Sequence, residues 1–282
     1  MASFLVLGAG YIGAKLGELA LAAGHEVVLA DNWYATERSQ LAPLEASGAR
    51  LATADIRRRE DIARLLAEQP DRVYLLAAQA SRPLSEREPD YTEETNVTGV
   101  RLVAEAVSAS PVPVVFGSSL HVYGTGLRGA VGPKHPYGPQ RDLAHLSKIY
   151  GELVLRMRAE RTPFDLEILR LGIVYGPSPV EHDAPGSQTV VDKFRRLAAA
   201  GKEPTVDDEE AMIGVVHIDD AARIMLGAPH ASGVSAVNVA AESISIGDLA
   251  RLARGDDRSR LVRCRYTSPF PYDHYVADYL RP

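Results

Sequence analysis

Three glycines with a fixed spacing are the residues of this sequence whose chemistry is easiest to assign. Gly8, Gly10 and Gly13 occur in FLVLGAGYIG, directly after a short apolar run and before a helical pattern. Glycines placed in this way permit a tight turn, let the backbone approach a pyrophosphate, and pack a helix against a strand, while the helix N-terminus offers N–H groups to the anion. The turn, with Tyr11 and Ile12 inside it, therefore predicts a phosphate-binding loop for a dinucleotide.

An acidic residue follows at the distance that a dinucleotide site requires. The next apolar run ends in VVLAD, which places Asp31 eighteen residues after Gly13. A carboxylate there would accept hydrogen bonds from both adenosine ribose hydroxyls and would repel a 2′-phosphate, so NAD is favoured over NADP as the cofactor. Alone, the glycines are compatible with an ordinary strand–helix turn and Asp31 with a helix cap; their combination at this spacing favours the dinucleotide site.

The composition limits the possible partners and the cellular location. The chain has 282 residues, of which 46% are hydrophobic, enough for a substantial core, and its net charge of -6 gives no broad basic surface. Nucleic acid and membranes are therefore not expected as partners, and a small-molecule substrate is. The single cysteine, Cys264, cannot form an internal disulfide, and the N-terminal segment lacks the basic residues of a signal peptide, so we expect a cytoplasmic protein.

Elements that would position these residues alternate along the chain. Short apolar runs such as those at 25–31, 72–78, 112–119 and 166–176 are separated by helical patterns at about 11–24, 95–108 and 142–161. This alternation predicts an α/β fold, a Rossmann-type doubly wound parallel sheet covered by helices on both faces. We expect residues 1–168 to form the NAD-binding domain and residues 169–282 to form a smaller C-terminal substrate-binding region interwoven with the sheet.

With these motifs the chain resembles the extended short-chain dehydrogenase/reductase family, in particular its NAD-dependent epimerase/dehydratase group. Further landmarks of the family occur in its order over nearly the whole chain: DNWYATER (31–38), TADIRR (53–58), LLAAQAS (75–81), ETNVTGV (94–100), GSSLHVYG (117–124), LRLGIVYGP (169–177) and VVHIDDAAR (215–223).

The resemblance implies where the cofactor binds and how the protein assembles. Further residues expected at the dinucleotide are Asn32 beside Asp31, Asp55 and Ile56 at the adenine, Ala77, Ala78 and Gln79 along its path, Lys148 at the nicotinamide ribose, and Leu171 at the nicotinamide. Asn96 is expected to be a structural hydrogen-bonding residue of the interior. Members of the family commonly dimerise through the helices that contain Asn96 and Lys148, so a homodimer is expected.

The catalytic residues match the family only in part. In the family a tyrosine exchanges a proton with the substrate oxygen, a lysine four residues later lowers the pKa of the phenol, and a serine fixes the oxygen. Ser119 and Lys148 match the serine and the lysine, but Ala144 stands where the tyrosine would be. A methyl group cannot transfer a proton, so the resemblance implies an atypical member that lacks the catalytic tyrosine.

Three side chains are candidates to replace the tyrosine, in the order Tyr137, His121, His145. Tyr137 could enter the vacant space from its loop, and His121, two residues after Ser119, could share a face with it. His145 is adjacent to Ala144 but about a hundred degrees around the helix, which should turn it away. Each also has the plainer interpretation of an exposed or packed polar residue. No cysteine pair or carboxylate cluster predicts a metal site.

Two further differences concern the substrate. Ile173 replaces an asparagine, and Ile213 replaces an arginine, that contact the substrate diphosphate in nucleotide-sugar members of the family. Isoleucines remove these polar contacts and make the wall of the binding site more apolar. We therefore expect the substrate to be a small metabolite rather than an ordinary nucleotide-diphosphate sugar. Arg195 or Arg196 could compensate from another direction.

Two classes of function follow from this pattern. The first is an NAD-dependent oxidoreductase or an enzyme of the epimerase/dehydratase type with a non-standard proton donor; a variant of it is a non-redox lyase or cyclase on the same fold. The second is a non-catalytic NAD-binding sensor or scaffold. The presence of Ser119 and Lys148 favours the enzyme, because a sensor has little need of either residue beside a substrate.

Overall fold

The computed structural model describes residues 1–181, 188–256 and 262–281, and its centre is a parallel sheet. Within these residues the sheet has seven strands in the order β10-β7-β5-β4-β1-β2-β3. In chain order they are β1 (Ser3–Leu7), β2 (Glu26–Asp31), β3 (Arg50–Thr53), β4 (Arg72–Leu75), β5 (Val114–Ser119), β7 (Leu166–Leu171) and β10 (Val234–Val239). The expected Rossmann-type parallel sheet is confirmed.

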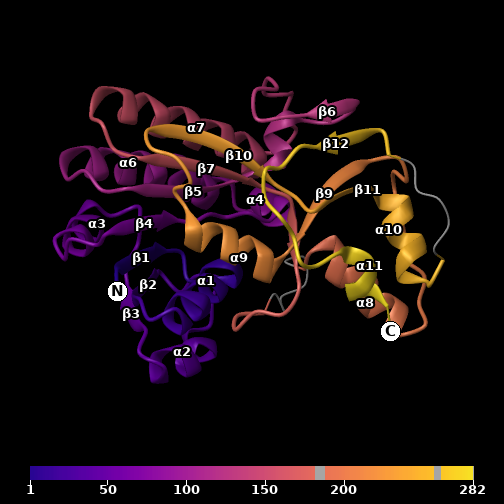
Figure 1. Cartoon of the computed structure of the whole chain (residues 1–282), viewed down its shortest axis with the longest axis horizontal. Helices are drawn as coiled ribbons and strands as arrows, with labels where there is room; N and C mark the ends of the chain where they lie inside the picture. Colours follow the sequence, from indigo (N-terminus) through magenta and orange to yellow (C-terminus); the bar gives the residue numbers. More distant parts are fainter. Residues whose placement is uncertain (182–187, 257–261, 282) are drawn as a thin grey trace.

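Helices cover both faces of this sheet (Figure 1). On one face lie α1 (Tyr11–Ala22) and α9 (Ile218–Gly227), and on the other α3 (Arg59–Leu66), α6 (Val100–Ala109) and α7 (Leu143–Arg161). Successive strand residues point to opposite faces, so Phe4 and Val6 belong to the hydrophobic core on the α1 side, whereas Leu5 and Leu7 belong to the core on the α6 side. The strand order reverses between β1 and β4, where ligands bind in such sheets.

The predicted helices form with altered bounds. The helix predicted at 95–108 is the second half of a longer run that comprises α5 (Pro89–Glu93), the π-helical segment η2 (Glu94–Gly99) and α6. Gly99 lies in the π-helical segment against Ile56: a Cβ there would come within 2.7 Å of the isoleucine side chain. The helix predicted at 142–161 begins one residue later, because the Asp142 side chain accepts from the His145 backbone N–H as an N-cap.

The apolar run 166–176 forms two strands in different sheets rather than one strand. After β7, Gly172 interrupts the run, and β8 (Ile173–Tyr175) joins β9 (Met212–His217) and β11 (Glu242–Ser245) in a three-stranded sheet. A side chain at Gly172 would come within 2.7 Å of the Gly214 carbonyl oxygen, so the two sheets approach each other only through glycine at this position.

The smaller C-terminal region surrounds the three-stranded sheet, to the right in Figure 1. It contains α8 (Val190–Ala199), α10 (Ile246–Ala253) and α11 (Val276–Leu280), and a two-stranded sheet of β6 (Gly129–Val131) and β12 (Cys264–Tyr266) adjoins it. The boundary expected after residue 168 falls inside β7, and β10 returns from the second part of the chain to the large sheet.

The remaining short elements are η1 (Arg38–Leu41), α2 (Ala42–Ala46), α4 (Arg82–Arg87) and η3 (Leu120–Tyr123). Of the helices in the described residues, none combines the length and the apolar character that crossing a bilayer requires.

Candidate functional site

A cleft of about 1030 Å³ lies at the carboxyl ends of the strands. All of the residues expected to bind the cofactor line it, and so do the candidates Ser119, His121 and Lys148; the cofactor residues are Gly8, Gly10, Tyr11, Ile12, Gly13, Asp31, Asn32, Asp55, Ile56, Ala77, Ala78, Gln79, Lys148 and Leu171. Tyr137 is not among the lining residues. The strand ends thus gather the residues of the predicted dinucleotide site into one cavity.

The glycine turn has the shape that a pyrophosphate requires. Gly8 has φ +104°, and a Cβ there would come within 2.4 Å of the Ala77 backbone nitrogen. A Cβ at Gly13 would come within 2.0 Å of the Gly8 carbonyl oxygen, whereas one at Gly10 would meet no protein atom closer than 3.5 Å. Gly10 is the N-cap of α1 and has no side chain, and the first turn of α1 contains no acidic residue. The helix N-terminus therefore suits an anion, and the residues present fit the expected cofactor.

Two carboxylates mark the expected adenosine end. Asp31 accepts hydrogen bonds from the backbone N–H groups of Ala9 and Trp33, both at 2.8 Å, and burial raises the pKa of its carboxyl group. At Asp55 burial acts in the same direction, but the hydrogen bonds from Arg57 and Asn32 outweigh it, and the pKa is lowered. Asp55 is therefore an anion at neutral pH, held beside Asn32 by a 3.2 Å hydrogen bond.

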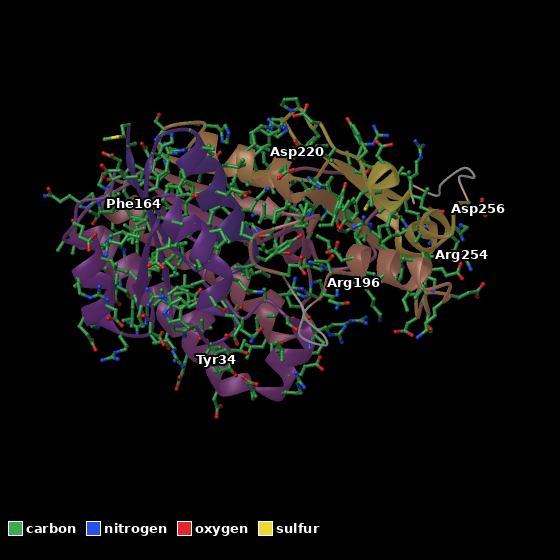
Figure 2. All side chains as sticks on the ribbon, turned by 90° about the horizontal axis from the view of Figure 1, so that it is seen from below. Tyr34, Phe164, Arg196, Asp220, Arg254 and Asp256 are labelled. Atoms are coloured by element: carbon green, nitrogen blue, oxygen red, sulfur yellow. The ribbon has the colours of Figure 1, made fainter. Side chains whose placement is uncertain are left out.

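A pair of tyrosines that the sequence analysis did not single out also lines this end. The rings of Tyr34 and Tyr91 stack with their centroids 4.0 Å apart, and the Tyr34 hydroxyl donates to Glu88. The Asn32 side chain donates to the Tyr91 hydroxyl at 3.2 Å. Figure 2 shows Tyr34 at the surface among the N-terminal elements, on the opposite side from Arg254. The two segments that carry the tyrosines thus meet across the mouth of the cleft, a contact between residues 57 positions apart that no local motif indicates.

Asn96 fixes the backbone of Gln79 on the wall of the cleft, as expected of a structural residue. Its side-chain oxygen accepts from the Gln79 N–H at 2.8 Å, and its amide group donates to the Gln79 carbonyl at 2.9 Å and to Ser147 Oγ at 3.0 Å. Asn96 is 2% exposed. Because the whole amide is used, Asn96 couples the wall of the cleft to α7.

The end of the cleft beside Ala144 contains Ser118 and Ser119 and two histidines. Ser119 Oγ lies 3.0 Å from His121 Nδ1, and it also accepts from the His121 backbone N–H at 3.2 Å. The His121 ring stacks on the His145 ring with centroids 4.1 Å apart and an angle of 6° between the planes. Both rings line the cleft beside Ala144. The expectation that His145 turns away is wrong, because the N-cap at Asp142 orients the first turn of α7 so that residue 145 faces η3.

Lys148 also faces the cleft from α7. Its Nζ donates to the Gly117 carbonyl at 2.8 Å and lies 5.2 Å from the centroid of the Phe116 ring. Burial lowers the pKa of the Lys148 ammonium to about 8. Ala144, one turn earlier, is 2% exposed. Lys148 and Ala144 thus both line the cleft, and the residue in the tyrosine position offers it only a methyl group.

Tyr137 lies in a different environment from the one expected for a proton donor. Its hydroxyl donates to the buried carboxylate of Glu152 at 2.9 Å. The same carboxylate accepts two-pronged hydrogen bonds from Arg170, the closest at 2.6 Å, and one from Ser118 Oγ at 2.6 Å. Burial raises the pKa of the Tyr137 phenol and the adjacent Glu152 adds to the effect. The structure therefore does not bring Tyr137 together with Ser119 and Lys148.

The two isoleucines expected at the substrate lie in different places. Ile173 lines the cleft, whereas Ile213 is 9% exposed, pairs with Ile244 in the small sheet and belongs to the core of the C-terminal region. Among the described lining residues, the lysine and arginine side chains are Lys148 and Arg82. Arg195 and Arg196 are not part of the lining; Arg196 lies on α8 in the C-terminal region (Figure 2).

One group of side chains in the described residues has the composition and proximity of a metal site. Ligand atoms of His217, Asp219 and His274 lie within 4.8 Å of one another. However, Lys15 Nζ lies 2.9 Å from Asp219 Oδ1, and the group adjoins the N-terminus of α9, so both neighbours disfavour a cation. The cleft lining does not include these three residues.

A parallel sheet whose strand ends gather a glycine turn, a carboxylate after the second strand and a serine–lysine pair in one cleft is typical of dinucleotide-dependent α/β enzymes. Residues 4–240 match the model of the "NAD dependent epimerase/dehydratase family", and the chain belongs to that family. The expected cofactor, NAD, is the one that the family description names.

Curated relatives and solved structures agree with this assignment. UDP-glucose 4-epimerase of Mycolicibacterium smegmatis is 32% identical over 237 residues, 81% of this chain and 74% of that protein. The structure of UDP-glucose 4-epimerase from Thermotoga maritima with UDP-glucose is 25% identical, covers 95% of this chain and 86% of its own, and has a TM-score of 0.78. That of the Thermus thermophilus UDP-glucose 4-epimerase with NAD is 26% identical, covers 96% and 88%, and has a TM-score of 0.75.

Proposed function

We propose that the protein catalyses NAD-dependent oxidation, reduction or epimerisation at a secondary alcohol carbon of a small metabolite, with Ser119 and His121 transferring the proton. The observation that carries this proposal is the 3.0 Å contact between Ser119 Oγ and His121 Nδ1 in the cleft beside Ala144. A hydroxyl and a neutral imidazole in contact can exchange a proton, which the methyl group of Ala144 in the tyrosine position cannot.

We propose a group of lining residues for each part of the cofactor. The glycine turn and the N-terminus of α1 would hold the pyrophosphate, Asp31 the hydroxyls of the adenosine ribose, and Asp55 with Ile56 the adenine. Lys148 would hold the nicotinamide ribose, and the backbone at Leu171 would face the nicotinamide. When bound, NAD supplies the acceptor or donor of a hydride.

Proton transfer follows from the hydrogen-bond directions at Ser119. Because Ser119 Oγ accepts from the His121 N–H, its own proton is available to His121 Nδ1. In the oxidation direction the substrate hydroxyl proton passes to Ser119 Oγ while the Ser119 proton passes to His121 Nδ1. The substrate C–H bond breaks with its electron pair, and the hydride goes to NAD. Reduction runs the same transfers backwards, and epimerisation combines the two on opposite faces of the carbonyl.

The substrate class is proposed from the charge and polarity of the cleft. The named relatives act on UDP-glucose, but Ile173 here offers no hydrogen bond to a diphosphate, and Ile213 is packed into the core of the C-terminal region. The described basic side chains of the lining are Arg82 and Lys148, and Lys148 is assigned to the cofactor, which leaves Arg82. A doubly charged diphosphate would be poorly held, so we propose a substrate without one.

The experiment is an assay of purified protein with NAD and a panel of small secondary alcohols, with UDP-glucose as a separate arm. Absorbance of reduced nicotinamide and chromatographic detection of epimers report the reaction. We expect conversion of a non-nucleotide substrate and none of UDP-glucose; Ile173→Asn, which restores the polar residue of the family, should bind UDP-glucose more tightly than the wild type. Absence of NAD binding by calorimetry would overturn the function, and turnover of UDP-glucose would overturn the substrate class.

We also propose that the protein is a homodimer, as the family resemblance implies, and that it is cytoplasmic. The support for the dimer is an apolar stripe on α7, formed by Leu146, Leu153 and Met157, which are 52%, 50% and 37% exposed. Their spacing places all three on one side of the helix, next to α6 on the outside of the sheet (Figure 1). A second copy of α7 would cover this stripe.

Leu153→Glu is expected to convert the dimer to a monomer, because it places a charge in the centre of the stripe. Sedimentation velocity of the wild type and the variant at the same concentration measures the change. Val262→Glu is the control, since Val262 is equally exposed, at 50%, but lies outside α7. A monomeric wild type, or a variant that remains dimeric, contradicts the proposed interface.

A further inference from the structure

The stacked pair of His121 and His145 occupies the space beside Ala144 from two separate elements. His121 belongs to η3, and His145 belongs to the first turn of α7. Each ring has one further fixed contact: His121 Nδ1 faces Ser119 Oγ at 3.0 Å, and His145 Nδ1 faces Asp142 Oδ2 at 2.7 Å. The side chain of Asp142 is 4% exposed. Four side chains thus lie in contact one after the other, in the order Ser119, His121, His145 and Asp142.

Asp142 is itself held in place, so it can hold His145. Its other carboxylate oxygen accepts from the His145 backbone N–H at 2.9 Å, which starts the helix, and Oδ2 lies 4.0 Å from Arg82 Nε. A carboxylate that contacts both the backbone and the ring of one histidine leaves that ring little rotational freedom. The plane of His145 is therefore fixed, and the His121 ring that lies 4.1 Å above it is held in the orientation that reaches Ser119.

The charges around His121 determine its protonation. Burial lowers the pKa of the His121 imidazole to about 4, and His145 acts in the same direction, while Asp142 opposes them. These two ionisable groups are His145, in the first turn of α7, and Asp142, its N-cap residue; Arg82 of α4 lies 4.0 Å from Asp142. At pH 7 His121 is thus a neutral ring. For Ser119 to donate its proton to Nδ1, the hydrogen of the neutral ring must lie on Nε2.

We propose that His145, anchored by Asp142, is a positioning residue that holds the His121 ring uncharged and in contact with Ser119 for proton transfer. This inference rests on the proposed function, in which His121 takes the Ser119 proton. Burial and electrostatic repulsion from the His145 ring both disfavour the protonated form of His121, so the ring returns its proton readily at the end of the transfer. His145 therefore acts on the rate through His121 and does not itself contact the substrate oxygen.

Nuclear magnetic resonance of the NAD-bound protein with isotope-labelled histidines tests the inference without any substrate. In the wild type, His121 should titrate below pH ~5, well under the ordinary range of histidine. His145→Phe keeps an aromatic ring in the stack but removes the ionisable side chain that lowers the pKa of His121, so the His121 midpoint should rise by roughly one pH unit. His145→Gln, which should fold if the phenylalanine does not fit, should give the same direction. His25→Phe is the control: His25 also packs on an aromatic ring, Phe4 at 4.5 Å, but lies outside the cleft, and its loss should leave His121 unchanged.

The pH profile of the reaction gives the second readout. Because His121 must be neutral to accept a proton, a higher pKa of His121 moves the acid limb of the rate to higher pH by the same interval. An unchanged His121 midpoint in both variants, or a wild-type midpoint near the ordinary value of about 6.5, overturns the inference. If no alcohol in the panel is converted but the midpoint shifts as stated, the proposed function fails while the positioning role of His145 stands. If an alcohol is converted but the His121 midpoint does not move, the proposed function stands and the positioning role of His145 fails.

Discussion

Glu152→Ala is expected to lower the free energy of unfolding by about 3–5 kcal/mol, the cost of leaving one member of a buried ion pair without its partner. The Glu152 side chain is 0% exposed and that of Arg170 is 3% exposed, with their closest atoms 2.6 Å apart. Removal of the Glu152 carboxylate leaves the Arg170 guanidinium buried without its counter-ion. It also takes away the acceptor of the hydroxyls of Ser118 and Tyr137.

The position of this pair in the fold makes the effect large. Glu152 lies on α7 and Arg170 on β7, and Arg170 also donates to the Tyr123 hydroxyl at 2.8 Å and to the Pro133 carbonyl at 2.9 Å. The network therefore joins a helix, the sheet, η3 and the loop that precedes α7. Since η3 carries His121 and α7 carries Lys148, loss of the pair should also loosen the reactive end of the cleft.

Chemical denaturation of the wild type and of Glu152→Ala measures this prediction. Glu105→Ala is a matched control: Glu105 has ion pairs with Arg59, Arg101 and Arg158, but its side chain is 23% exposed, so a loss of at most about 1 kcal/mol is expected. The double variant Glu152→Leu, Arg170→Met should lose less stability than the single one, because it strands no charge. Equal losses for Glu152→Ala and Glu105→Ala would show that the buried pair contributes no more than a surface pair.

The sheet and the cofactor end of the cleft could be predicted from the sequence because their determinants are local. The strands β1, β2, β4, β5 and β7 coincide with short apolar runs, whereas β3 and β10 do not. The glycine turn needs glycine for reasons that act within a few residues: a side chain at Gly13 would overlap the Gly8 carbonyl. The position of Asp31 relative to the glycine turn follows from the length of the one helix and the one strand between them. Ligands of parallel sheets gather at the strand ends, so these residues had to meet.

The reactive end could be predicted only in part because its contacts join distant segments. The stack of His121 on His145 depends on how η3 faces the N-cap of α7. The helical angle between Ala144 and His145, taken alone, predicts that His145 points away from the site, which is wrong. Tyr137 was the first candidate for the missing phenol, but its hydroxyl is taken by Glu152. Glu152 and Arg170 lie 18 residues apart, and no local sequence pattern predicts that they form an ion pair.

The second large effect is expected at the proton-transfer pair. Ser119→Ala removes the hydroxyl proposed to contact the substrate oxygen, and His121→Phe removes Nδ1 while keeping a ring against His145. Positioned acid–base groups contribute about 10²–10⁴-fold to a rate, so each variant should lower kcat by at least about 100-fold. The double variant should be no slower than the slower single variant, because the two residues act on one proton. Tyr137→Phe should lower kcat less than Ser119→Ala or His121→Phe does, because the Tyr137 hydroxyl donates to Glu152 and Tyr137 does not line the cleft.

The most direct test of the central claim is the rate of hydride transfer between NAD and a converted substrate, followed by the absorbance of reduced nicotinamide in a single turnover. Wild type, Ser119→Ala, His121→Phe and Tyr137→Phe are compared under conditions in which all four are folded and saturated with NAD. We predict that the serine and histidine variants lose at least about 100-fold in rate while Tyr137→Phe retains it. Full activity of Ser119→Ala and His121→Phe, with loss of activity in Tyr137→Phe, would contradict the account.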